Sequence, residues 1–102
     1  MPAAKDTSAG LDALGTLARS AQYRQVIRYL VDNPNSFKGQ IHDATGIPTS
    51  SLGRHLSDLE TRGIVTGDIE VGQKRRGYAV RYIVDVDYVD TLLTTLRTEL
   101  LG

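Results

Sequence analysis

The sequence predicts a mainly α-helical domain with one small β-hairpin, and three observations support this fold class. Apolar residues recur at helical spacing over most of the 102-residue chain. Over residues 64–84 they change to the alternation that is typical of strands. Pro34, Gly46 and Gly63 fall between the periodic segments, where proline and glycine end helices. The length corresponds to one domain, which we expect to span residues 1–102.

The composition excludes several kinds of protein. Lys plus Arg and Asp plus Glu each number 12, so the net charge is zero and any nucleic-acid surface must be local. The chain has no cysteine, which excludes disulfides, thiolate metal sites and cysteine nucleophiles. No apolar run approaches the roughly 20 residues of a membrane span, and the N-terminus has no hydrophobic signal core. We therefore expect a cytoplasmic protein with no membrane partner.

After a loose tail expected over residues 1–6, two helical segments follow. The first covers residues 7–19, and the second ends at the sequence DNPNS, where Pro34 prevents further helix. No strong helix breaker lies between them, so one continuous helix and two helices are both compatible with the sequence. Their apolar stripes comprise Leu11, Leu14, Leu17 and Ala18 in the first segment and Tyr23, Val26, Ile27 and Leu30 in the second.

Two short helices joined by a tight turn come next. Ser36 is placed to cap a helix over residues 37–45, and Gly46 is placed to end it in a left-handed conformation. The second helix begins near Pro48, and Gly63 ends it. The residues expected to be buried are Phe37, Ile41 and Ala44 in the first helix and Leu52, Leu56 and Leu59 in the second.

A β-hairpin and a last helix complete the domain. The sequences IVTGDIEV and YAVRYIV are rich in β-branched and aromatic residues and flank the turn GQKRRG. Tyr78 and Tyr82 are expected to pack within this hairpin. Asp87 is placed to cap a helix over residues 87–101, with Asp90 in a capping-box-like position. The apolar stripe of this helix is Val89, Leu92, Leu93, Leu96 and Leu100.

This order of elements is that of a winged helix-turn-helix, in which the second helix of the pair enters the DNA major groove and the hairpin forms a wing. Small hydroxyl side chains on that helix can bond phosphates or base edges. Gly53 removes bulk, and Arg54 can pair with guanine or a phosphate. The predicted DNA contacts of the helix are Thr49, Ser50, Ser51, Gly53, Arg54 and His55. An ordinary solvated helix used for protein contact is the alternative interpretation.

The hairpin turn carries the only basic cluster of the chain, which is formed by Lys74, Arg75 and Arg76. At the tip of a wing these cations would contact the phosphates of DNA. A solvated turn that charge keeps soluble is the alternative. We predict phosphate contact, because the cluster falls where a wing meets the DNA backbone.

Leucine stripes at both ends of the chain favour a homodimer, because so small a domain gains stability from assembly. We expect a DNA-binding core over residues 20–86 and dimerisation helices over residues 7–19 and 87–101. The predicted dimer contacts are Leu11, Leu14, Leu17, Leu92, Leu96 and Leu100.

Residues 20–84 resemble the winged-helix core of the ArsR family of bacterial transcriptional repressors. The resemblance rests on VIRYL, on IHDATGIPTSSLGRHLSDLETRGIV across the helix pair, and on GQKRRGYAVRYIV at the hairpin. The family pattern SRHLxxLxxxGLV appears here as GRHLSDLETRGIV. The resemblance implies a repressor that binds double-stranded DNA, with the last helix matching the family's dimerisation helix. It is a resemblance to members that do not sense metals, because the cysteine and histidine ligands of metal-sensing members are missing.

Nothing in the sequence indicates an enzyme, a cofactor or a metal site. The two histidines, His42 and His55, lie near Asp43 and Asp58 without the spacing of metal ligands. No Ser-His-Asp arrangement, phosphate-binding glycine loop or carboxylate pair stands out. The sequence thus predicts a dimeric DNA-binding repressor of transcription whose small-molecule effector, if it has one, is unknown. The alternative is a winged-helix protein-interaction module of a transcription or replication assembly.

Overall fold

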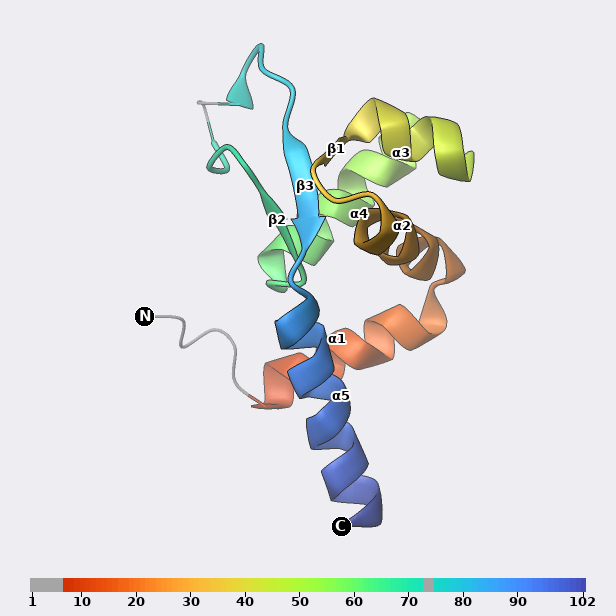
Figure 1. The fold of residues 1–102 in the computed structure, drawn as a ribbon, viewed down its shortest axis with the longest axis vertical. Helices are drawn as coiled ribbons and strands as arrows, with labels where there is room; N and C mark the ends of the chain where they lie inside the picture. The colour runs from red at the N-terminus through yellow and green to blue at the C-terminus, as the bar shows by residue number, and fades with distance from the viewer. Residues whose placement is uncertain (1–6, 73–74) are drawn as a thin grey trace.

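The computed structural model describes residues 7–72 and 75–102, and its helices lie beside and below one small sheet in the view of Figure 1. The described residues form five helices and three strands. In chain order these are α1 (Thr7–Arg19), α2 (Ala21–Asp32), β1 (Ser36–Phe37), α3 (Lys38–Thr45), α4 (Thr49–Thr61), β2 (Val65–Gly67), β3 (Arg81–Val84) and α5 (Val86–Leu101). The predicted mainly helical fold with a small hairpin is confirmed. The tail expected over residues 1–6 lies outside the described residues.

α1 and α2 are two helices because the backbone of Ser20 between them is extended (φ −121°, ψ 107°). The Ser20 hydroxyl oxygen accepts a hydrogen bond from the backbone N–H of Tyr23 at 3.1 Å and caps α2. Arg24 donates to the carbonyls of Leu17 and Ala18 at 3.0 and 2.8 Å, which satisfies the last turn of α1. Capping by Ser20 and Arg24 therefore makes this region two helices and not the single continuous helix that the sequence also allows.

The boundaries of α3 agree with the sequence at one end and differ at the other. Gly46 ends the helix in the predicted left-handed conformation, with φ 75°. The prediction that Ser36 caps α3 is wrong, because its buried hydroxyl donates to the Asn33 carbonyl at 2.7 Å. At the start of the helix the Gln40 side chain accepts from the backbone N–H of Phe37 at 2.8 Å instead.

The sheet is antiparallel, with strand order β1-β3-β2. β2 and β3 form the predicted hairpin, in which Gly67 lies opposite Tyr82. These strands are shorter than the alternation in the sequence indicates, and residues 68–80 connect them. β1 pairs with β3 through two residues only, which are too few to show an alternation. For that reason the sequence does not indicate this strand.

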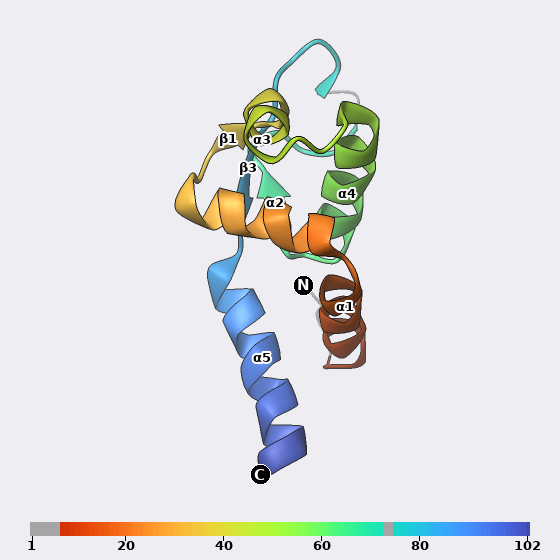
Figure 2. The ribbon, with the colours of Figure 1, turned by 90° about the vertical axis from the view of Figure 1, so that its right-hand side faces the viewer.

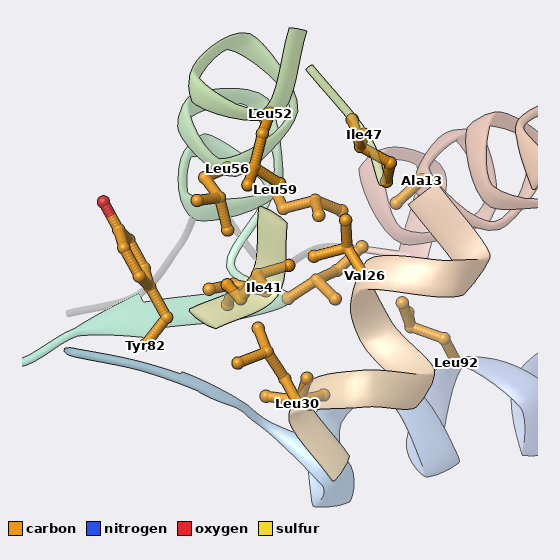
Figure 3. Packing of buried hydrophobic residues seen from close by; sticks show 13 residues of the cluster. Ala13, Val26, Leu30, Ile41, Ile47, Leu52, Leu56, Leu59, Tyr82 and Leu92 are labelled. Carbon is orange, nitrogen blue, oxygen red and sulfur yellow. The ribbon is translucent and has the colours of Figure 1, made fainter. Parts of the chain in front are cut away.

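The buried side chains gather between α2, α4 and the sheet (Figure 3). Leu52, Leu56 and Leu59 are at most 1% exposed, which confirms the predicted buried stripe of α4. Ala44 was predicted to be buried and is exposed, because Ile41 is the buried residue of the short α3. The buried cluster comprises Ala13, Val26, Leu30, Ile41, Ile47, Leu52, Leu56, Leu59, Ile64, Val65, Tyr82, Val84 and Leu92.

α5 begins earlier than predicted because Asp85, and not Asp87, caps it. The Asp85 carboxylate accepts a hydrogen bond from the backbone N–H of Tyr88 at 3.0 Å. Leu92 is buried, whereas Leu100 is 71% exposed, so the predicted apolar stripe is packed only near its beginning. Figure 2 shows the C-terminal half of α5 extending away from the rest of the molecule.

The crossing of α1 and α5 depends on Gly10. A Cβ at this position would overlap Cδ2 of Leu92 and lie 3.6 Å from the Tyr88 hydroxyl. We expect Gly10→Ala to lower the free energy of unfolding by about 1–3 kcal/mol, the usual cost of overpacking. Urea denaturation measures the change. The control is Gly39→Ala, where a Cβ meets open space and stability should not fall. A Gly10→Ala variant as stable as the wild type would contradict this close crossing.

Candidate nucleic-acid interface

α4 presents polar side chains on the side opposite its buried leucines. Ser50, Arg54, Ser57 and Thr61 follow one another at helical spacing and are all exposed. We call these four residues the α4 stripe. α4 lies at the outer edge of the molecule in Figure 2, so a large ligand has access to it. Ser57 and Thr61 were not among the residues predicted from the sequence, although they continue the helical repeat of Ser50 and Arg54.

His55 is turned toward α2 and away from the α4 stripe. Its Nε2 lies 2.7 Å from Oε1 of Gln22, and its ring centroid lies 4.7 Å from that of Tyr23. Burial and the nearby Arg54 lower the pKa of the imidazole, so the neutral ring predominates at pH 7. Among the predicted DNA contacts on this helix, Thr49, Ser50 and Arg54 are exposed, whereas Ser51, Gly53 and His55 are half-buried.

A chain of polar contacts fixes α4 on α1 and α2. The Tyr23 hydroxyl donates to one carboxylate oxygen of Asp58 at 2.6 Å. Arg62 donates to the other oxygen of Asp58 and to Asp12, both at 3.0 Å. Burial and the Asp58 carboxylate raise the pKa of Tyr23 to about 12. These residues lie far apart in the sequence, so no pattern there indicates that they meet.

The two described residues of the predicted basic cluster, Arg75 and Arg76, have different surroundings. Arg76 is exposed. Arg75 folds back onto α4, where its two terminal nitrogens donate to the two carboxylate oxygens of Glu60 at 2.8 and 2.6 Å. The side chains of this pair are only 19% and 12% exposed. Arg76 is therefore available to a ligand, whereas Arg75 is already paired. Lys74 lies outside the described residues.

Lys38 is a cation beside α4 that was not predicted from the sequence. It is exposed at the first position of α3, and its Nζ lies 3.7 Å from the place that a Cβ of Gly53 would take. Gly53 therefore leaves space beside α4 that the Lys38 side chain borders. A single lysine at the start of a helix forms no pattern with its neighbours, which is why the sequence does not single it out.

An open groove separates α4 from the loop that follows β2. Its lining carries both signs of charge and includes Lys38, Ser57, Glu60, Asp68 and Arg75. Among residues 7–72 and 75–102, no group of three or more His, Asp or Glu side chains is arranged to hold a metal ion. No helix in the same part of the chain is long and apolar enough to cross a bilayer.

The six predicted dimer contacts divide between the core and the surface. Leu92 is buried, Leu11, Leu14, Leu17 and Leu96 are half-buried, and Leu100 is exposed. Leu93, Leu100 and Leu101, which we call the distal leucines, are 50%, 71% and 71% exposed. The most exposed apolar side chains of α5, Leu100 and Leu101, therefore lie at its C-terminal end.

Comparison with known proteins assigns no family to the chain. The sequence matches no protein-family model, and no curated protein is similar to it at a significant level. The resemblance to ArsR repressors therefore stays a prediction, which rests on the motifs of the helix pair and the hairpin.

The raised pKa of Tyr23 makes the stability depend on pH in alkali. Because tyrosine ionises near 10 in the unfolded chain and near 12 here, its contribution is complete below pH 10 and is lost as the pH rises through 12. We expect Tyr23→Phe to remove this part of the decline in the free energy of unfolding, as measured by urea denaturation between pH 10 and 12. Asp58→Asn, which keeps an acceptor oxygen but removes the negative charge beside the phenol, should shrink the same decline. A wild-type profile in both variants would contradict the contact.

Proposed function

We propose that this protein is a sequence-specific, double-stranded DNA-binding regulator of transcription, a winged helix-turn-helix repressor of the ArsR type without metal sensing. In this proposal α3 and α4 form the helix pair, α4 is the recognition helix, and the β2–β3 hairpin is the wing. The order of elements supports it, because two helices joined by a short turn are followed by an antiparallel hairpin and a final helix.

The charge that α4 displays is the observation that carries the proposal. The helix contains two carboxylates, Asp58 and Glu60, and both are paired inside the molecule with Arg62 and Arg75. Arg54 is exposed and lies within the α4 stripe. α4 therefore offers a polyanionic ligand a cation and several hydroxyls, although the net charge of the whole chain is zero.

The dimensions of α4 suit the major groove of DNA. Its 13 residues make a helix of about 20 Å, and the groove, about 12 Å wide, admits a helix. Ser50, Ser57 and Thr61 are short, so the helix backbone can approach the base edges, while Arg54 can reach a guanine or a phosphate. Lys38 is exposed on α3, beside this helix, and is suited to the phosphate backbone.

The zero net charge favours a second candidate, a winged-helix module that binds another protein in a transcription or replication assembly. The mixed charges that line the groove between α4 and the hairpin suit a protein surface as well. Duplex affinity that falls steeply with salt would separate the two candidates, because only binding to DNA releases condensed counterions.

We also propose that the protein forms a two-fold homodimer through α1 and α5. Leu100 and Leu101 are exposed in the last turn of α5, and this end of the helix projects from the molecule (Figure 2). A helical end without tertiary packing is marginal in water, and a second copy would cover it. Such a dimer presents two copies of α4 to the two halves of a palindromic site.

Selection of bound duplexes from a random pool tests DNA binding, symmetry and target together, and a palindromic product is expected. With that duplex, Arg54→Ala should weaken binding by about 1–3 kcal/mol at one base position if Arg54 reads guanine. Arg28→Ala, which removes an exposed arginine of α2, is the control and should keep the selected sequence. A wild-type protein that retains no duplex, or binds with no salt dependence, would refute the proposed function.

Leu100→Asp tests the dimer without disturbing the buried core, because Leu100 is 71% exposed. An uncompensated charge in an apolar interface costs several kcal/mol, so the variant should sediment as a monomer at micromolar concentration where the wild type is a dimer. Val71→Asp is the matched control, since Val71 is 76% exposed and lies on the hairpin loop. A wild-type chain that sediments as a monomer would end the dimer proposal.

A further inference from the structure

The loop between β2 and β3 returns to α4 through one arginine. Nη1 and Nη2 of Arg75 donate to Oε1 and Oε2 of Glu60 at 2.8 and 2.6 Å, and Nε donates to the carbonyl of Ile69 at 2.8 Å. The planar guanidinium and the carboxylate thus meet fork to fork, a geometry that a lysine cannot reproduce. The Arg75 side chain thus links its own part of the loop to Ile69, near the end of β2, and to Glu60 on α4, the recognition helix of the proposal.

The backbone of β2 provides the space for this pair. A Cβ at Gly67 would lie 2.5 Å from Nη2 of Arg75, 2.7 Å from Cγ1 of Val80 and 3.2 Å from Oε2 of Glu60. Any larger residue at position 67 would therefore push the guanidinium away from the carboxylate. The glycine is explained by the close approach of these side chains.

The position of Arg76 follows from that of Arg75. The backbone N–H of Arg75 donates to the Gly72 carbonyl at 3.1 Å, and its carbonyl accepts from the N–H of Tyr78 at 3.0 Å. Arg75 thus ends one turn and begins the next, and the exposed Arg76 is the second residue of that next turn. Fixing the Arg75 side chain on α4 fixes where the Arg76 backbone lies.

We propose that Arg75 and Glu60 form a strap that holds the hairpin loop at a set position beside α4, so that Arg75 is a positioning residue and Arg76 makes the phosphate contact. This inference rests on the proposed function. Drawing Arg75 out to a phosphate would leave the 12%-exposed Glu60 carboxylate without its partner. A solvent-exposed contact between Arg75 and a phosphate would offset little of that loss, so the Arg75–Glu60 pair persists when DNA is bound.

For Glu60→Gln, the strap and a direct phosphate contact by Arg75 predict opposite changes in the affinity for DNA. Glu60→Gln removes a negative charge close to the ligand, which by itself strengthens binding to DNA. If the strap positions Arg76, the same substitution weakens binding to a random-sequence duplex about fivefold at 0.15 M salt, the worth of one phosphate contact. Arg75→Lys keeps the charge and loses the fork, so it should weaken binding to the same degree.

The experiment measures the affinity and its salt dependence for the wild type, Glu60→Gln, Arg75→Lys, Arg76→Ala and the double variant Glu60→Gln with Arg76→Ala. Arg76→Ala should lower the slope of log affinity against log salt by about one. The double variant should bind no more weakly than Arg76→Ala alone, whereas two independent losses would multiply. Asp32→Asn, which removes an exposed carboxylate at the end of α2, is the control and should not weaken binding.

Circular dichroism confirms that each variant is folded before it is compared. Where Glu60→Gln loses the fold, Gly67→Ala tests the strap by displacing Arg75 without changing any charge. The strap would be overturned if the Glu60→Gln variant bound DNA at least as tightly as the wild type. It would also be overturned if the Arg75→Lys variant had wild-type affinity. A wild-type protein that shows no salt-dependent duplex binding would instead refute the proposed function on which the strap rests.

Discussion

Burial of the leucine face of α4 determines which of its side chains can meet a partner. Leu52, Leu56 and Leu59 are almost completely buried, and burial of each is worth about 1.5–3 kcal/mol. These leucines fix the depth of the helix, but a smooth apolar face resists rotation about the helix axis only weakly. Directional contacts on the two flanks supply that resistance, through Asp58 on one side and Glu60 on the other. The helix is thus held on three sides, and its fourth side is the exposed stripe.

The same flanking contacts set the electrostatic character of the exposed side. A recognition helix with two acidic residues would repel phosphates, and the sequence alone gives no reason to discount Asp58 or Glu60. Each carboxylate is paired with an arginine that does not belong to the α4 stripe, and Arg62 is shared with Asp12 of α1. Packing and charge are therefore coupled here, because the contacts that orient the helix also remove its negative charge from the side proposed to meet DNA.

The elements of the fold could be predicted wherever the cause is local. Gly46 and the spacing of the leucines identify the helix pair, since both depend on residues within one or two turns. The cap of α5 was misplaced because Asp85 and Asp87 are chemically alike, and only the backbone conformation distinguishes them. The pairing of Arg75 could not be predicted, because it depends on the missing side chain of Gly67 and on a carboxylate of another element. Of the candidate site, the sequence therefore indicates which helix is exposed but not which charges remain unpaired.

The close crossing of Gly10 and Leu92 joins the first helix to the last one. During synthesis α1 leaves the ribosome first, yet the surface that it covers on α5 is made only after the hairpin has been completed. A contact between such distant positions has to overcome the entropy of closing nearly the whole chain into a loop. α1 should therefore dock late in folding, onto a core that α2, α3, α4 and the sheet have already formed. Until it does, the apolar side chains that it shields remain open to other nascent chains, including copies of its own.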